Sequence, residues 1–594
     1  MSNSQLPHWD LTPVFPSLDS PKFEGEFSSV TPGIEAMATR FERLGVRRRA
    51  QSDVDAAFAA SVDEVLPAWN ALSERLDVLF SYLHCLVSTD AKDEAAQARL
   101  SQLESQTVAL DALETRLVAW IGTSDIEALL EQSPAAREHE FWIRRAHVLA
   151  SHQMSEAEEH LAAALRPMGY AAWSKLHGQM TALLTAEVKL DGQVQTLPMS
   201  AVRALASHPD RSVRERAFQS EMEAWPKVAL PLAAALNSIK GFARDLHSRR
   251  GWSDDVAPTL LGNSIDSATL VAMQGACAEA FPDFRRYMNA KARVLGVEKL
   301  GWFDLIAPVG GTDEKWDWER CEEFVERNFG RYSDKMAAYA RRTFDKRWID
   351  AGPRVGKEGG AYCTEIGAGQ SRISMNFDGS FTQVSTLAHE LGHGYHNGCL
   401  QTRTPLQKQI PMTLAETSSI FCETLVFEAA VESAEREEKL FLLDNALSRN
   451  LQVVVDIHSR FLFEQSVFQN RANGELGESQ LCDLMTQTQL ETYGEEVSPL
   501  HPYMWAVKGH YYGSTFYNYP YTFGLLFALG LYARYKENPQ EFRAKYDDFL
   551  SRCGLEDAAT LAREFGFDTT QPDFWRASLN IIRDQINDFV SLVG

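Results

Sequence analysis

The stretch Thr382-Gln-Val-Ser-Thr-Leu-Ala-His-Glu-Leu-Gly-His-Gly-Tyr-His396 contains the motif His389-Glu390-Leu391-Gly392-His393. Apolar residues recur along it at helical spacing, and Ser380 or Thr382 can cap its start. On a helix of 3.6 residues per turn, positions i and i+4 lie one above the other. The stretch therefore predicts a helix that directs two imidazoles to one place, with Glu390 beside them.

H-E-x-x-H is a pattern in which two histidines bind zinc and the glutamate acts as a general base. A histidine pair on a helix can also be purely structural. With 15 histidines in 594 residues, a chance match has a probability of about a few in a hundred, so the motif needs support from its surroundings. Gly394 and Gly398, which follow the motif, are expected to let the helix end.

A catalytic zinc usually has three protein ligands and leaves one position open. Glu416, 23 residues after His393 (416 − 393), lies at the start of a second stretch with helical periodicity and is the predicted third ligand. Glu423 follows two turns later on roughly the same face. It is predicted to accept a hydrogen bond from a ligand imidazole.

Other potential ligands near the motif are less suitable. The H-E-x-x-H-x-x-G-x-x-H form would need glycine at 396 and histidine at 399, where this chain has His396 and Cys399. His396 is therefore interpreted as a structural histidine. Cys399 and Cys422 are interpreted as thiols in the core, because four protein ligands would close a catalytic site.

Several motifs together resemble the oligoendopeptidase F family, relatives of thimet oligopeptidase and neurolysin. They are Met375-Asn-Phe-Asp-Gly-Ser-Phe-Thr-Gln-Val-Ser-Thr-Leu-Ala-His-Glu-Leu-Gly-His393, Leu414-Ala-Glu-Thr-Ser-Ser419, Phe516-Tyr-Asn-Tyr-Pro-Tyr-Thr-Phe-Gly524, Trp9-Asp-Leu-Thr-Pro-Val-Phe-Pro-Ser17 and Lys357-Glu-Gly-Gly-Ala-Tyr-Cys363. The resemblance implies a largely helical metallopeptidase that cuts short peptides inside a deep channel.

The resemblance also implies roles for individual residues. One Zn²⁺ per chain would be bound by His389, His393 and Glu416, and Glu390 would be the general base. In the C-terminal motif, His510 and Tyr519 would be catalytic, stabilising the charge that develops on the peptide carbonyl, and Tyr512 and Tyr517 would contact the substrate. Between His510 and Tyr519 the chain is shorter than in thimet oligopeptidase, so the assignment of roles among the tyrosines stays open. Read without the resemblance, each tyrosine is as well explained by packing.

The stretch from Ser371 to Phe377 alternates apolar and polar residues and is predicted to be a strand leading into the zinc helix. As an edge strand it would pair with the backbone of a peptide substrate, which permits varied side chains. Gly359 and Gly360, just upstream, are predicted to let a loop approach that peptide, although a plain connecting turn explains them equally well.

The fold is predicted to be mainly α, with two helical parts enclosing a deep substrate channel and a small β-sheet next to the zinc helix. Long helical patterns occupy residues 47–78, 93–121, 155–184, 321–344 and 415–468. Asp191-Gly192, between two short alternating stretches, predicts a hairpin. Near it lies the predicted boundary between an N-terminal helical domain (1–190) and a catalytic domain (191–594).

The net charge of −23 argues against nucleic acid, because binding to phosphates needs clustered positive charge. No stretch has the roughly 18 apolar residues expected of a membrane span, and the residues from Met1 onward lack an export signal. Eight cysteines are scattered without disulfide-like spacing, which is typical of a reducing compartment. A cytoplasmic location is expected, and the sequence does not indicate an oligomeric state.

The favoured hypothesis is a zinc-dependent endopeptidase that cuts internal bonds of short unstructured oligopeptides. One rival is a peptide-binding or scaffold protein that performs no chemistry. Another is a zinc hydrolase acting on a non-peptide amide, since the same metal chemistry permits it.

Overall fold

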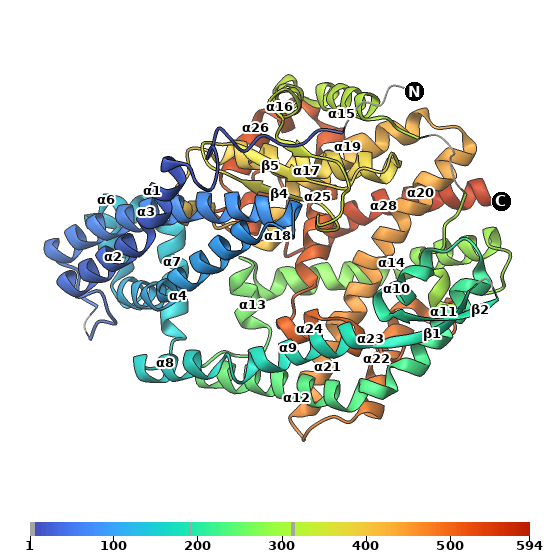
Figure 1. The fold of residues 1–594 in the computed structure, drawn as a ribbon, viewed down its shortest axis with the longest axis horizontal. Helices are drawn as coiled ribbons and strands as arrows, with labels where there is room; N and C mark the ends of the chain where they lie inside the picture. Colours follow the sequence, from blue (N-terminus) through green and yellow to red (C-terminus); the bar gives the residue numbers. More distant parts are fainter. Residues whose placement is uncertain (1–5, 51, 191, 311–314) are drawn as a thin grey trace. The chain divides into compact units, whose positions relative to one another are not determined.

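The computed structural model describes residues 6–50, 52–190, 192–310 and 315–594. Within these residues the fold is mainly helical with two small sheets, which confirms the prediction of a mainly α fold with little β-structure (Figure 1). None of the helices in the described ranges is both long and apolar enough to cross a lipid bilayer.

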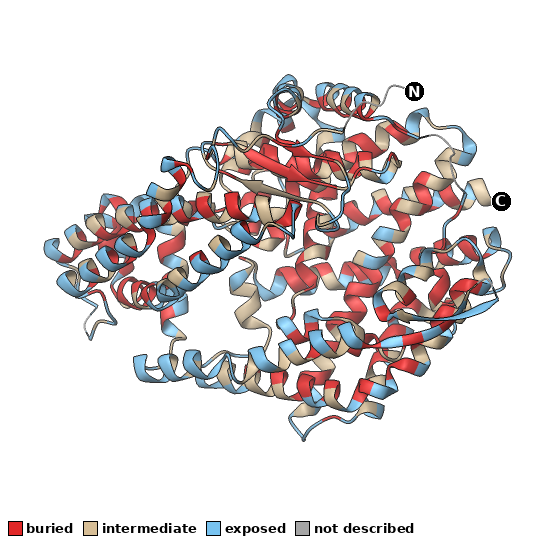
Figure 2. Ribbon diagram, in the orientation of Figure 1, coloured by how far each residue is buried: buried red, intermediate tan, exposed pale blue. Residues whose placement is uncertain are grey.

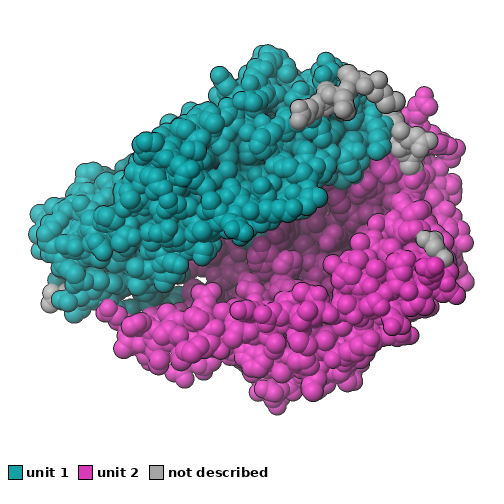
Figure 3. Space-filling view, viewed as in Figure 1, with its two compact units in different colours: residues 1–153, 314–429, 534–565 teal, residues 154–313, 430–533, 566–594 magenta. Residues whose placement is uncertain are grey.

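The chain forms two compact units, each assembled from three stretches of sequence and coloured separately in Figure 3. Unit 1 comprises residues 1–153, 314–429 and 534–565, and unit 2 comprises residues 154–313, 430–533 and 566–594. The predicted domain boundary follows Leu190, the last residue of a strand in unit 2, and stays a prediction.

Unit 1 contains most of the elements that surround the predicted zinc helix. They are α1 (Pro21–Ser28), α2 (Val30–Leu44), α3 (Ala56–Thr89), α4 (Glu94–Gly122), α5 (Ile126–Gln132), α6 (Pro134–Glu138), α7 (Glu140–Ser151), α15 (Trp318–Tyr332), α16 (Asp334–Asp345), β3 (Ile349–Asp350), β4 (Tyr362–Glu365), β5 (Ser371–Ser374), α17 (Phe381–Cys399), α18 (Met412–Ala415), α26 (Pro539–Ser551) and α27 (Ala558–Arg563). Helix α19 (Thr417–Ser433) begins in unit 1 and ends in unit 2.

Unit 2 carries the C-terminal histidine and tyrosine motif. Its elements are α8 (Glu156–Leu165), α9 (Tyr170–Leu183), β1 (Thr185–Leu190), β2 (Gln193–Pro198), α10 (Met199–Ala204), α11 (Arg211–Ala224), α12 (Pro226–Arg249), α13 (Ala257–Gly262), α14 (Ser267–Val294), α20 (Arg436–Leu451), α21 (Ile457–Arg471), α22 (Glu478–Tyr493), α23 (Met504–Val507), α24 (His510–Gly513) and α28 (Pro572–Val593). Helix α25 (Tyr519–Glu537) begins in unit 2 and ends in unit 1.

Local signals predicted many of these elements. The helical pattern over 93–121 corresponds to α4, which Asp93 caps by accepting from the backbone N–H of Ala96. The pattern over 155–184 is divided into α8 and α9 near Gly169. The predicted hairpin is formed by β1 and β2, which pair antiparallel. Asp191 itself lies outside the described residues.

The three-stranded sheet of unit 1 lies against the predicted zinc helix, as the sequence suggested. Its strand order is β3-β5-β4, and both β4 and β5 pack on α17. The prediction that residues 371–377 form an edge strand is therefore wrong. Strand β5 is central because it pairs in parallel with β3 and antiparallel with β4, so its backbone groups are already used. Residues 371–374 are also buried (Figure 2).

Each unit has its own apolar core. In unit 1 it is built mainly from α1 to α7 and includes Phe23, Leu66 and Trp120. In unit 2 it includes Trp225, Phe463 and Trp505. These side chains are almost fully removed from solvent, and burial of such area is the main favourable contribution to folding.

Candidate metal centre

Helix α17 carries the H-E-x-x-H motif. Ser380 caps its first turn by accepting a hydrogen bond from the backbone N–H of Gln383. Gly394 lies inside the helix and not at its end, so that part of the expectation is wrong, whereas α17 does end at Cys399, one residue after Gly398. A Cβ atom at Gly394 would lie 2.2 Å from the Tyr339 hydroxyl oxygen. This glycine therefore permits the close approach of Tyr339, from α16, to the zinc helix.

Gly392, inside the motif, permits an equally close approach on another side. A Cβ atom there would lie 2.6 Å from the carbonyl oxygen of Ser418 and 2.6 Å from the Cα atom of Ser419. Both neighbours are backbone atoms at the start of α19, directly after Glu416, so they cannot turn aside as a flexible side chain would. The absence of a side chain at Gly392 therefore lets the segment that carries Glu416 approach the motif.

Replacing Gly392 by alanine is expected to lower the free energy of unfolding by about 2 kcal/mol, since overpacking a tight contact typically costs 1–3 kcal/mol. It should also weaken zinc binding, because the backbone next to Glu416 must move. Chemical denaturation and metal titration would measure both effects. Gly398→Ala is the matched control, since a Cβ atom there meets only Tyr339, at 3.8 Å. Equal losses in both variants would contradict the packing argument.

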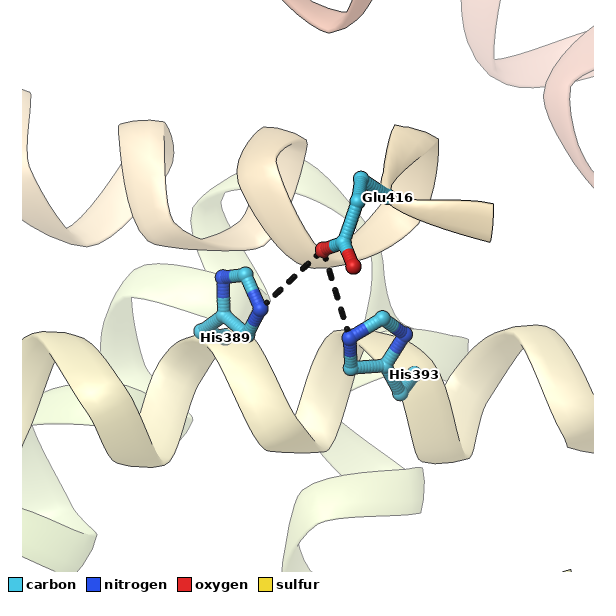
Figure 4. A group of neighbouring side chains, drawn as sticks. All are labelled: His389, His393 and Glu416. Atoms are coloured by element: carbon cyan, nitrogen blue, oxygen red, sulfur yellow. Dashed lines mark ion pairs between the residues drawn. The ribbon is translucent and has the colours of Figure 1, made fainter. Parts of the chain in front are cut away.

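The structure brings together His389, His393 and Glu416 (Figure 4). Oε2 of Glu416 lies 3.2 Å from Nε2 of His389 and 3.4 Å from Nε2 of His393. One ligand atom from each residue can be chosen so that all lie within 4.8 Å of one another. The three side chains are about a quarter exposed, so solvent and small molecules can reach them.

The geometry and the charges fit a zinc ion. Two ligand atoms that are each about 2.1 Å from a tetrahedral ion lie about 3.4 Å apart, close to the distances from Glu416 to the imidazoles. Burial would lower the pKa of His389, but hydrogen bonds to Glu416 and Glu423 outweigh it and raise that pKa to about 10. Burial would raise the pKa of Glu416, yet its contacts with both imidazoles hold it well below its usual range. The site thus attracts a cation, which a proton or a divalent metal can provide.

Glu423 holds His389 from the other side of the ring. Its Oε2 lies 3.2 Å from Nδ1 of His389, and its Oε1 accepts a hydrogen bond of 3.0 Å from the Ser385 hydroxyl. A carboxylate on the far nitrogen orients an imidazole and makes it a stronger ligand. This is the place that the sequence predicted for Glu423.

Two serines in this network were missed by the sequence reasoning. Ser385 lies one helical turn before His389, and Ser419 donates a hydrogen bond of 2.9 Å to Oε2 of Glu416. Ser385 could have been found from its position four residues before His389, which places the two side chains on the same face of the helix. The signal for Ser419 was its position three residues after Glu416.

Glu390 lies beside the metal group and has an unsatisfied carboxylate. It is buried, and its Oε2 has no hydrogen-bond partner among the protein groups of the described chain. Burial, the largest influence, raises the pKa of this carboxyl, and the neighbouring imidazoles oppose that rise. Because a buried acceptor without a partner is unfavourable, this oxygen is suited to receive a hydrogen bond or a proton from a water or substrate.

The remaining residues of unit 1 that the sequence singled out are not members of this group. Nε2 of His396 lies 3.0 Å from the carbonyl oxygen of Leu550, within the core. Cys422 is also fully buried. Gly359 and Gly360 lie in an exposed loop before β4, where Gly360 has φ +85° and its carbonyl accepts a hydrogen bond from the Asn376 amide. The glycine is required there because this backbone conformation is strained for other residues.

In unit 2, His510 and Tyr517 form an accessible pair. Their rings stack with centroids 5.0 Å apart and an interplanar angle of 25°. His510 is exposed and Tyr517 is half-buried, with its hydroxyl 3.2 Å from that of Tyr521. Although one side of the residue is open to solvent, partial burial of its ring, followed by the charges of Arg460 and Lys508, lowers the pKa of His510, which favours the neutral ring at neutral pH.

Tyr512 and Tyr519 are covered by protein. The Tyr512 ring is fully buried, stacks on His177 at 3.8 Å and donates a hydrogen bond of 3.4 Å to the carbonyl of Leu232. It lies in the core of unit 2, so we do not include it in the proposed substrate site. The Tyr519 hydroxyl lies 3.3 Å from both the Thr259 hydroxyl and the Asn263 amide nitrogen. It would have to leave these contacts to reach a substrate.

Two family profiles and several curated proteins match this chain. The profile of Peptidase family M3 matches residues 204–581, and that of Oligopeptidase F matches residues 120–185. An oligoendopeptidase F homolog from Lactococcus lactis is 22% identical over 66% of each chain. Group B oligopeptidase PepB from Streptococcus agalactiae is 21% identical over 88% of each chain, and oligopeptidase PepF from Bacillus subtilis is 20% identical over 98% of this chain and 87% of its own.

Solved structures show the same fold. A crystal structure from Chlamydophila abortus superposes with a TM-score of 0.82 at 19% identity, covering 98% of both chains. That of oligoendopeptidase-F from Enterococcus faecium gives a TM-score of 0.69 at 17% identity, covering 96% of this chain and 99% of the other. Because the family profile spans more than half of the sequence, the predicted resemblance is confirmed: the chain belongs to peptidase family M3.

Proposed function

We propose that this M3-family protein is a zinc-dependent endopeptidase that hydrolyses internal bonds of short, unstructured oligopeptides. The observation that carries the proposal is the convergence of His389, His393 and Glu416 beside the unsatisfied carboxylate of Glu390. The names of the curated relatives, oligoendopeptidases and oligopeptidases, support the peptide substrate. The cytoplasmic location stays a prediction.

The residues of unit 1 divide the chemistry among them. His389, His393 and Glu416 hold the ion, and Glu423 keeps the ring of His389 in place. When bound, zinc polarises a peptide carbonyl and makes the attacking water more acidic. Glu390 takes the proton from that water at its free Oε2 and later delivers it to the departing amine. This role needs a carboxylate that is not one of the ligands, which Glu390 provides.

The residues of unit 2 are proposed to stabilise the charge that develops on the carbonyl oxygen. His510 is exposed and can donate an N–H, and Tyr517 beside it presents a hydroxyl. Tyr519 is kept as a catalytic candidate, with its hydroxyl held by Thr259 and Asn263 until a substrate displaces it. The loop with Gly359 and Gly360 is proposed to contact the peptide backbone.

Hydrolysis of a quenched fluorescent peptide by the purified protein tests the proposal. We expect cleavage at an internal bond, complete inhibition by a chelator, and recovery when zinc is added back, because the bound ion would polarise the peptide carbonyl and acidify the attacking water. Mass spectrometry of the products would locate the bond. Binding of the peptide without cleavage, unaffected by the chelator, would favour the scaffold hypothesis. Faster turnover of small non-peptide amides than of peptides would favour the hypothesis of a zinc hydrolase that acts on non-peptide amides.

Glu423→Gln should reduce zinc affinity or turnover by about 10–100-fold, the usual effect of removing a hydrogen-bonded partner of a ligand histidine. The amide keeps the size of the side chain and can still bond Ser385, but it is a weaker acceptor for the N–H of His389. Zinc titration and steady-state kinetics would measure the change. Ser385→Ala should have a smaller effect in the same direction. If Glu423→Gln had the zinc affinity and turnover of the wild type, the contact between Glu423 and His389 would not affect metal binding or catalysis.

A further inference from the structure

A cavity of about 680 Å³ lies wholly within unit 2, between α12, α13, α14 and α21. Its volume is within the range of small-molecule sites, roughly 300–1,000 Å³. The predicted metal ligands are not among its lining residues. The cavity is therefore a separate feature of the chain that the proposed chemistry does not use.

One wall of the cavity is aromatic. Phe461, Phe468 and Phe516 line it, and the ring of Phe516 packs on the other two at centroid distances of 5.3 and 5.4 Å. Leu260 and Leu270 add aliphatic surface from α13 and α14. Such walls favour an occupant with an aromatic or branched aliphatic group.

Two polar groups at the cavity lack partners. Both the oxygen and the nitrogen of the Gln274 amide are covered, and neither has a hydrogen-bond partner among the described protein groups. The same is true of Nδ1 of His458. Gln274 lines the cavity from α14. Because a carboxamide both donates and accepts, an amide in the occupant would satisfy both of its atoms.

The charges around the cavity do not favour an anion. Arg244 contributes one positive charge, and its guanidinium donates to the carbonyl of Phe468. Asp254 and Asp255 contribute two negative charges, with Asp255 paired to His247. Burial lowers the pKa of His458 to about 4, so its ring is neutral at neutral pH. The lining therefore selects for an uncharged group over a carboxylate or phosphate.

We propose that this cavity is a binding site for an uncharged apolar amide, such as a peptide segment with an aromatic or leucine side chain. The aromatic wall would hold the side chain, and Gln274 would bond the amide. The site also borders a predicted catalytic residue, because Phe461 packs on Tyr519 and α13 carries Thr259, which contacts the Tyr519 hydroxyl. The binding itself does not depend on the proposed peptidase activity.

Calorimetric titration of the full chain with N-acetyl-L-phenylalaninamide tests the proposal. We expect saturable binding, at least about tenfold tighter than that of N-acetyl-L-phenylalanine, whose carboxylate would face the two aspartates. Gln274→Leu should weaken the binding about tenfold, since it removes the hydrogen bonds and keeps the bulk. Gln219→Leu, the same exchange at an exposed position of α11, is its control.

A second variant targets the cavity itself. Gly275 is an exposed residue of α14 that lines the cavity, and a Cβ atom there would meet nothing within 4 Å, so Gly275→Leu is designed to place an apolar side chain at the cavity. We expect it to abolish binding of the probe while the melting temperature is kept. Gly25→Leu, at an exposed helical glycine of α1 that is equally open, should bind as the wild type does. Absence of binding to the wild type, equal affinity for the acid, or undiminished binding by Gly275→Leu would overturn the proposal.

Discussion

Glu390→Gln is expected to lower peptide hydrolysis by about 10³-fold or more while zinc stays bound, since positioned acid–base catalysis contributes about 10²–10⁴-fold. The amide has the size of the carboxylate but cannot take a proton from water. Glu390 is not one of the three residues that group around the metal position, so the ligand set is unchanged. The loss should appear in kcat more than in KM, because the proton transfer belongs to the chemical step.

Parallel measurements of zinc content and kinetics separate this result from a folding defect. Replacement of a buried charged group without a protein partner should preserve or raise stability. Glu35→Gln makes the same exchange at an exposed position of α2 and serves as the control. It should leave the zinc content and the rate of hydrolysis unchanged. If Glu390→Gln kept most of its activity, another group would have to be the base.

The local part of the metal centre could be predicted from the sequence. His389 and His393 are one helical turn apart, and a helix of known period determines how they lie. Glu416 was also predicted from the sequence, by its position at the start of a second stretch with helical periodicity, but how closely this stretch approaches the motif is a tertiary property that no local pattern encodes. The contact of Ser385 with Glu423 was missed for this reason, because these two residues meet only when the helices pack together. The contact of Ser419 with Glu416 is local, since the residues are three positions apart, and it could have been predicted.

The errors in the sequence reasoning have tertiary causes. Gly394 was interpreted as a helix end because glycine inside a helix costs about 1 kcal/mol relative to alanine. In the structure it lies mid-helix, where a side chain would clash with Tyr339. Strand β5 was expected at an edge, but its alternation of side chains does not report how many neighbours the strand has. Likewise, the sequence could not distinguish the buried Tyr512 from the accessible Tyr517.

Glu416→Gln is expected to weaken zinc binding by more than about 100-fold, which exceeds the effect of losing a partner of a ligand. Its Oε2 is the atom that approaches both imidazoles, and the exchange removes the charge that draws a cation to them. Hydrolysis should fall with the metal content and recover in part at high zinc concentration. This recovery would distinguish Glu416→Gln from Glu390→Gln, which should stay inactive at any zinc concentration.

Thermal unfolding in the presence of zinc gives a test of Glu416 that does not depend on activity. A ligand that binds only the folded state stabilises it by RT ln(1 + [L]/Kd), so at 100 times Kd the wild type gains about 2.7 kcal/mol. At the same zinc concentration, a variant with a Kd raised 100-fold gains only about 0.4 kcal/mol. The zinc-dependent rise in melting temperature should therefore nearly disappear in Glu416→Gln and persist in Glu390→Gln. An equal rise in both would show that Glu416 is not a ligand, and that the ion is held by the histidines with a different third group.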